Sequence, residues 1–162
     1  MLSKSVQDAL NNQVGLEAAS SQAYLAMASW ADIQPGLQGV TEFFYTQAEE
    51  ERVHMLKLIK YVNERGGFAV VPALAQPIIT FQSLKRVFEE FLRHELGVSE
   101  SINDIVHLAF QEKDYATHNF LHLNLDKQCR FSSRQKELPR LHWINVRNFE
   151  KVTDYFQISC SL

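Results

Sequence analysis

Long segments with helical periodicity and without internal proline constrain the fold of this chain more than any other feature. Between Lys4 and about Ala31 the sequence contains neither proline nor a turn dipeptide, and apolar residues recur at steps near three and four. These residues are Val6, Leu10, Tyr24, Met27, Ala28 and Ala31. The spacing predicts one long amphipathic helix.

Two further segments show the same periodicity. One follows the Pro35-Gly36 turn and stops at Gly66-Gly67, and the other begins after the cap residue Ser83 and continues to about Glu112. Their apolar stripes comprise Val40, Phe44, Ala48, Met55, Leu58 and Val62, and then Leu84, Phe88, Phe91, Val98, Ile102 and Ile105. Each segment predicts a long helix, and a short turn should make the first two helices antiparallel.

The connections between these helices define the topology. Residues 68–80 contain Pro72 and Pro77 and lack helical periodicity, which predicts an extended segment that crosses the length of the bundle. A short turn at Lys113-Asp114 leads into a fourth helix near Tyr115. We therefore expect an all-α fold, a four-helix bundle with one long crossover between the second and third helices.

The hydrophobic content of 46% is enough for the core of a single domain over residues 1–162. The bundle should span about residues 4–138, because Pro139 cannot lie inside the fourth helix. The apolar residues of segment 139–162 fit a short fifth helix or a docking tail, and both alternatives stay open.

Charge and cysteine content argue against several functional classes. The formal net charge of -3 gives no support for nucleic-acid binding, and no apolar run reaches the length of about 18 residues that a membrane helix needs. Cys129 and Cys160 lack the spacing of a zinc motif and the density of a disulfide scaffold. We expect a cytoplasmic protein without nucleic-acid or membrane partners.

Each of the first three helices carries one glutamate inside its apolar stripe. Glu17, Glu51 and Glu95 all lie near the middle of their predicted helices, and His54 follows Glu51 by one turn on the same face. Middle positions of neighbouring helices coincide in height, so these groups should meet in the bundle interior. Several carboxylates there would be unfavourable unless protons or cations neutralised them.

The ligand types indicate which cation would fit. Carboxylates with one imidazole and no thiolate suit iron or another hard to borderline divalent ion. A single Glu or His at an amphipathic boundary is more often a hydrogen-bonded surface residue, but three carboxylates at one height with His54 favour a metal site. Tyr24 fits plain core packing or a hydrogen bond to a ligand.

The sequence resembles the bacterial non-haem ferritins over about residues 1–125. The resemblance rests on the residues named above and on several motifs. The motifs are Glu17 with Tyr24, residues 47–55 (QAEEERVHM), residues 64–67 (ERGG), His94-Glu95, Glu112-Lys113-Asp114 and Asn119-Phe120-Leu121. The resemblance implies a ferritin-like di-iron bundle. A haem-binding relative would have methionine near Arg52 or Val53, so we expect no haem.

The family also implies roles for individual residues. Glu17, Glu51 and His54 would hold one iron, Glu51 would bridge, and Glu95 would serve the second iron, while Glu50 matches a ligand of a third site. The implied assembly is a hollow 24-subunit shell that oxidises Fe(II) with oxygen or peroxide and stores the ferric mineral. The aromatic residues Trp30 and Phe43, which we expect to face outward from a single bundle, also favour a large homo-oligomer.

The resemblance ends after Leu121, where the family continues with an acidic run. Only Gln128 matches, as the glutamine beside the second iron, and Phe131 stands where a second-iron carboxylate is expected. Residues 127–140 instead carry a net charge of +4. True divergence and a reading-frame or sequence-assignment problem would both explain this change.

These observations leave more than one function open. The main interpretation is an iron-storage ferroxidase, and the alternative is a shell subunit with impaired or no ferroxidase activity. A rubrerythrin-like peroxidase would need a second E-x-x-H and a four-cysteine site, which the sequence lacks. A metal-free interaction module would leave the buried carboxylates without explanation.

Overall fold

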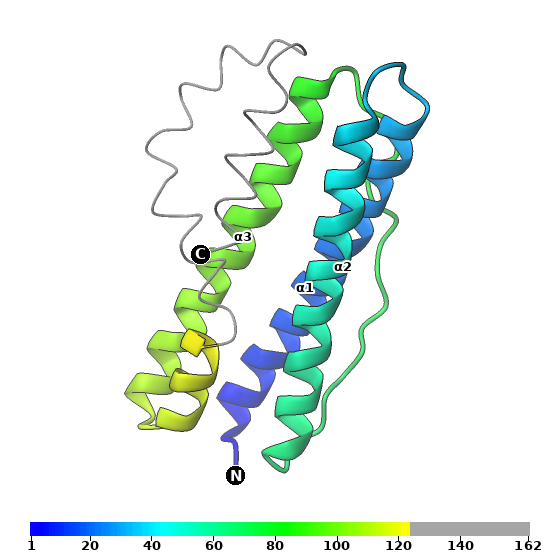
Figure 1. The fold of residues 1–162 in the computed structure, drawn as a ribbon. Helices are drawn as coiled ribbons and strands as arrows, with labels where there is room; N and C mark the ends of the chain where they lie inside the picture. The colour runs from blue at the N-terminus through cyan, green and yellow to red at the C-terminus, as the bar shows by residue number, and fades with distance from the viewer. Residues whose placement is uncertain (124–162) are drawn as a thin grey trace.

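The computed structural model describes residues 1–123, which form a helical bundle (Figure 1). Helix α1 spans Lys4–Asp32, α2 spans Gln38–Glu64 and α3 spans Leu84–Gln111, and a fourth helix begins at residue 115 and is described to residue 123. The extended crossing segment returns the chain along the bundle, so that α2 and α3 run in the same direction and α1 runs opposite to both. The predicted all-α four-helix class with its long crossover is confirmed.

Local signals set the helix ends. The side chains of Ser3 and Ser83 accept hydrogen bonds from the backbone N–H groups of Val6 (3.1 Å) and Arg86 (3.3 Å), so each caps the start of its helix. At the end of α2, Gly66 takes a positive φ of 76°, a conformation that glycine adopts at little cost. The predicted end of this helix just before Gly66-Gly67 is confirmed.

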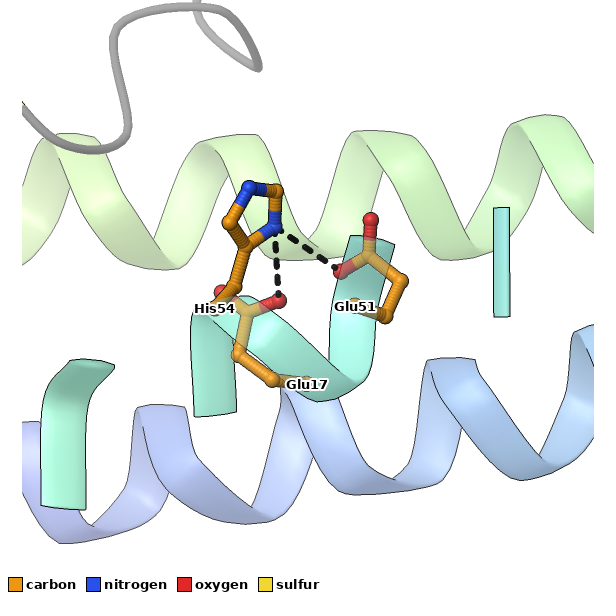
Figure 2. Close-up of side chains that lie close together, drawn as sticks. All are labelled: Glu17, Glu51 and His54. Atoms are coloured by element: carbon orange, nitrogen blue, oxygen red, sulfur yellow. Dashed lines mark ion pairs between the residues drawn. The ribbon is translucent and has the colours of Figure 1, made fainter. Parts of the chain in front are cut away.

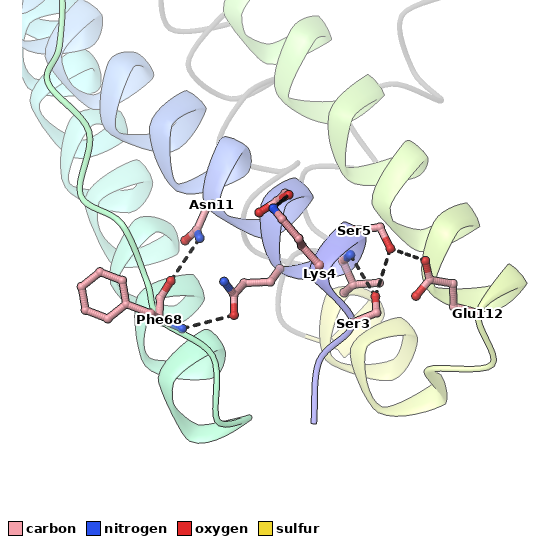
Figure 3. A network of polar contacts seen from close by, with 9 residues as sticks. Ser3, Lys4, Ser5, Asn11, Phe68 and Glu112 are labelled. Atoms are coloured by element: carbon pink, nitrogen blue, oxygen red, sulfur yellow. Dashed lines mark hydrogen bonds and ion pairs between the residues drawn. The ribbon is translucent and has the colours of Figure 1, made fainter.

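Polar contacts tie the start of α1 to two later segments (Figure 3). The Asn11 side chain donates to the carbonyl of Phe68 over 3.1 Å, and the N–H of Phe68 donates to the Gln7 side chain over 3.3 Å. The Ser5 hydroxyl donates to the Glu112 carboxylate just after α3. These contacts fix where the crossing segment leaves α2, and thereby help to place α3.

The apolar interior consists of two clusters, one toward each end of the bundle. One cluster includes Tyr24, Met27, Phe44 and Phe91, and the other includes Leu10, Leu58, Ile102 and Leu121. On each long helix, a middle layer with one buried glutamate lies between the residues of the first cluster and those of the second. Glu17, Glu51 and Glu95 lie in this middle layer, so the buried acids separate two apolar halves.

Two aromatic residues contradict the prediction that they face outward. Phe43 is only 7% exposed, and its ring packs against Phe44 and Phe91 with centroids 5.1 and 5.5 Å apart. Trp30 is half-buried, and its ring meets Phe81 edge-on at 5.7 Å. The prediction was wrong because α3 and the residues just before it supply aromatic partners from the same chain.

Several predictions fall outside the described residues. They concern Gln128, Phe131, the end of the fourth helix at Pro139 and the fifth helix or docking tail of segment 139–162. Within residues 1–123, no helix is both long enough and apolar enough to cross a membrane.

Candidate metal centre

The three mid-helix glutamates are buried side chains from three different helices. Glu17 on α1 is 0% exposed, Glu51 on α2 is 3% exposed and Glu95 on α3 is 6% exposed. Burial of three ionisable carboxyls in one layer is energetically unfavourable unless something compensates their charge. The layer therefore has the character of a binding site rather than of a core.

Glu17, Glu51 and His54 form its tightest group. Each offers a ligand atom, and these atoms all lie within 4.8 Å of one another (Figure 2). His54 Nδ1 lies 3.7 Å from Glu51 Oε2 and 3.9 Å from Glu17 Oε2. Both separations exceed hydrogen-bond length, but they suit atoms that share one cation at about 2.0–2.2 Å each.

The electrostatics of this group favour a bound cation. Burial, followed by a hydrogen bond with Glu51 and the charge of Glu51, raises the pKa of Glu17 well above its ordinary value. In the absence of a cation, two neighbouring buried carboxyls retain a proton between them. A divalent cation can replace that proton, and a set of carboxylates and one imidazole fits iron.

Gln13 is a member of the site that the sequence analysis did not single out. Its amide N–H donates to Glu17 Oε1 over 2.8 Å, while the other oxygen of Glu17 faces His54. Gln13 is 0% exposed, and its carbonyl Oε1 has no hydrogen-bond partner among the described residues. Its position one helical turn before Glu17, on the buried face of α1, was the signal that could have identified it.

Tyr24 and Glu95 form a second buried pair in the same layer. The Tyr24 hydroxyl donates to Glu95 Oε1 over 2.5 Å, and its ring packs against Phe91 with centroids 4.9 Å apart. Burial raises the pKa of Glu95 to about 7. The sequence left open whether Tyr24 packs in the core or donates a hydrogen bond to a candidate ligand. In the structure it does both, because its ring contacts Phe91 and its hydroxyl binds Glu95.

His94 and Ser20 border this pair. The Ser20 hydroxyl lies 3.3 Å from His94 Nδ1, and the His94 ring meets Tyr24 edge-on at 5.9 Å. Burial lowers the pKa of His94, so its neutral form is favoured. These contacts restrict the orientation of the tyrosine ring.

Glu50 and Gln128 are the two remaining predicted ligands. Glu50 is half-buried, and its carboxylate accepts a hydrogen bond from the Gln47 side chain over 3.0 Å. Its charge contributes to the raised pKa of Glu95, so it borders the layer without joining the three-residue group. Gln128 lies outside the described residues.

A bundle of this topology, with buried glutamates and a half-buried histidine at mid-height, defines a ferritin-like protein. The chain belongs to this family, because the profile described as "Ferritin-like domain" matches residues 7–134.

Comparisons with individual proteins agree. The chain is similar to a "Probable bacterial non-heme ferritin-like protein" of Haemophilus influenzae, 42% identical over 128 residues that cover 79% of this chain and 77% of that protein. It is 40% identical to the "Bacterial non-heme ferritin" of Staphylococcus aureus over 128 residues, which cover 79% of this chain and 76% of the relative. The resemblance to this family is thereby confirmed.

Solved structures support the same assignment. A ferritin from Chlorobium tepidum superposes with a TM-score of 0.77 at 36% identity, with all of both chains covered. An open pore ferritin from the archaeon Archaeoglobus fulgidus gives a TM-score of 0.82 at 30% identity and covers 96% of this chain and 97% of its own.

Proposed function

We propose that this protein binds Fe(II) at the layer formed by Glu17, Glu51, His54 and Glu95, oxidises it, and stores the ferric product. The observation that carries the proposal is the group formed by the buried Glu17 and Glu51 and the half-buried His54, whose ligand atoms lie within 4.8 Å of one another. Family membership and the names of the relatives support iron as the cation.

In this proposal the residues form two iron-binding positions. Glu17 Oε2, one oxygen of Glu51 and His54 Nδ1 hold the first Fe(II), which is a substrate of the protein. Glu51 bridges to a second position near Glu95, whose other oxygen is held by Tyr24. The iron ions supply the electrons that reduce oxygen or peroxide, while the protein fixes their positions and gives up the proton held between its carboxyls when iron binds.

We also propose that the protein assembles into a hollow shell of about 24 copies. We expect each copy to be a single domain over residues 1–162 and the shell to lie in the cytoplasm. The ferritin names of the relatives and of the solved structures support a storage assembly. In this proposal Glu50 is a ligand of a third iron site and Gln128 serves the second iron.

A second candidate is a shell subunit with impaired or no ferroxidase activity. It is favoured by the sequence after Leu121, where Phe131 occupies the position of an expected carboxylate and residues 127–140 carry a net charge of +4. In that case the first iron position would persist, and the second would rest on Glu51 and Glu95 alone.

Anaerobic Fe(II) titration followed by exposure to oxygen separates these outcomes. Two irons bound per chain with rapid oxidation support the ferroxidase, whereas one tightly bound iron with slow oxidation supports the alternative. Glu17→Gln, Glu51→Gln and His54→Ala should each abolish tight binding and leave the helical content unchanged. Glu49→Gln, an exposed change on the same helix, is the matched control. Unchanged binding in all three site variants would contradict the proposal.

A further inference from the structure

Two histidines outside the bundle interior form a pair on the fourth helix. His118 and His122 are separated by one helical turn, and their ring centroids lie 4.6 Å apart at an interplanar angle of 51°. His122 is exposed and His118 is half-buried, with the Phe110 ring of α3 at 6.0 Å from His118. Neither residue contributes to the buried glutamate layer.

The opposite face of this helix explains why the pair points outward. Thr117 and Leu121 are buried, and the Phe120 ring stacks on Tyr61 with centroids 3.8 Å apart. These contacts fix the rotation of the helix against the bundle. The two imidazoles are therefore presented together on a rigid support, next to the end of α3.

The spacing of the rings matches that of two ligands on one metal ion. Imidazole nitrogens bind zinc at about 2.0–2.1 Å, which places the centroids of two neighbouring ligand rings about 4.5–5 Å apart. Histidines one turn apart on a helix are a recognised arrangement for metal chelation. The observed separation of 4.6 Å is therefore compatible with two rings bound to one ion.

We propose that His118 and His122 form a second metal site, on the outside of the bundle, for a divalent cation that prefers imidazole, such as Cu²⁺ or Zn²⁺. Within the described residues, the only group of three or more close ligands is the one around Glu17, so no carboxylate joins this pair. Water would fill the remaining positions. Two imidazole donors suit Cu²⁺ and Zn²⁺, whereas the described ligands of the core centre are mainly carboxylates.

The test is a titration of the full-length protein with Cu²⁺ alone, followed by electron paramagnetic resonance. We expect a hyperfine pattern from two imidazole nitrogens. His118→Ala and His122→Ala should each remove this pattern and lower Cu²⁺ affinity by roughly ten- to a hundredfold, because the second ligand on one rigid helix acts at high effective concentration. Both residues are at least partly exposed, so the variants should keep their helical content, which circular dichroism checks.

Two further variants separate this site from its surroundings. His107→Ala removes an exposed histidine of α3 that belongs to no described ligand group, and it should leave the signal unchanged. His54→Ala disables the core centre and should also leave the signal unchanged, so this inference can fail or succeed independently of iron binding. An unaltered pattern in both pair variants, or its loss in either control, would overturn the proposal.

Discussion

Gln13 donates its amide N–H to Glu17 Oε1 over 2.8 Å, and both side chains are completely buried. A carboxylate held at one oxygen cannot rotate freely, so its second oxygen stays directed toward His54. Helix α1 therefore positions the first ligand of the candidate centre with its own neighbouring residue.

Replacement of this amide should weaken the centre without unfolding the bundle. In Gln13→Leu the donor to Glu17 is lost, and we expect Fe(II) affinity to fall about 10- to 100-fold, as is typical for partners that orient a metal ligand. Anaerobic titration measures the effect. Gln22→Leu, at an exposed position of the same helix, is the control. Wild-type affinity in Gln13→Leu would show that Glu17 does not depend on this hydrogen bond.

Tyr24→Phe should affect the second metal position more than the first. The ring and its contact with Phe91 remain, but Glu95 loses a hydrogen bond of a kind worth about 1.5–3 kcal/mol, so binding of the second iron should weaken about tenfold or more. Stoichiometric Fe(II) titration resolves the two binding steps. Tyr45→Phe on the exposed face of α2 serves as control. Equal weakening of both steps would argue against a separate role for Glu95.

The metal-free protein should become less stable as the pH rises. The pKa of Glu95 is about 7 in the folded chain, against an ordinary value of 4.5, so the folded state holds an additional proton between these values. This contribution to stability is fully present below pH 4.5 and is lost as the pH rises through 7. The difference for Glu95 is roughly 3–4 kcal/mol at most, because each pKa unit corresponds to about 1.4 kcal/mol.

Urea unfolding of the metal-free protein at pH 5 and pH 8 measures this dependence. Glu95→Gln should reduce the slope of stability against pH and be more stable than the wild type at pH 8. Part of the slope should persist, because the raised pKa of Glu17 acts in the same direction. An identical slope in the variant would show that Glu95 is not the titrating group.

The start of the fourth helix depends on Asp114. Its carboxylate accepts hydrogen bonds from the N–H (3.1 Å) and the hydroxyl (2.6 Å) of Thr117, and it pairs with Arg65 at 3.1 Å. Asp114→Ala removes a helix cap and an ion pair and should destabilise the protein by about 1–3 kcal/mol. Urea unfolding checks this, with exposed Asp104→Ala as the control. A loss no larger than in the control would mean that the cap is dispensable.

Much of the fold was predictable because its signals are local. Serine caps, the glycine pair after α2 and the two prolines of the crossing segment act on their immediate neighbours, and the structure places the described boundaries within a residue or two of the predicted ones. The periodicity also marked Glu17, Glu51 and Glu95 as polar residues on buried faces. Their metal roles remain a prediction that the proposed titrations test.

The sequence by itself thus determined the helices and which faces they bury, since capping and periodicity depend on residues close together in the chain. Only the tertiary structure decided that Phe43 packs inside the bundle, that Tyr24 binds Glu95 and that the ligand atoms of Glu17 and His54 approach one another. Such contacts join residues on different helices, and they depend on the rotation and height of each helix against the next. Periodicity indicates which face of a helix is buried, but packing of the complete core selects the partners across it.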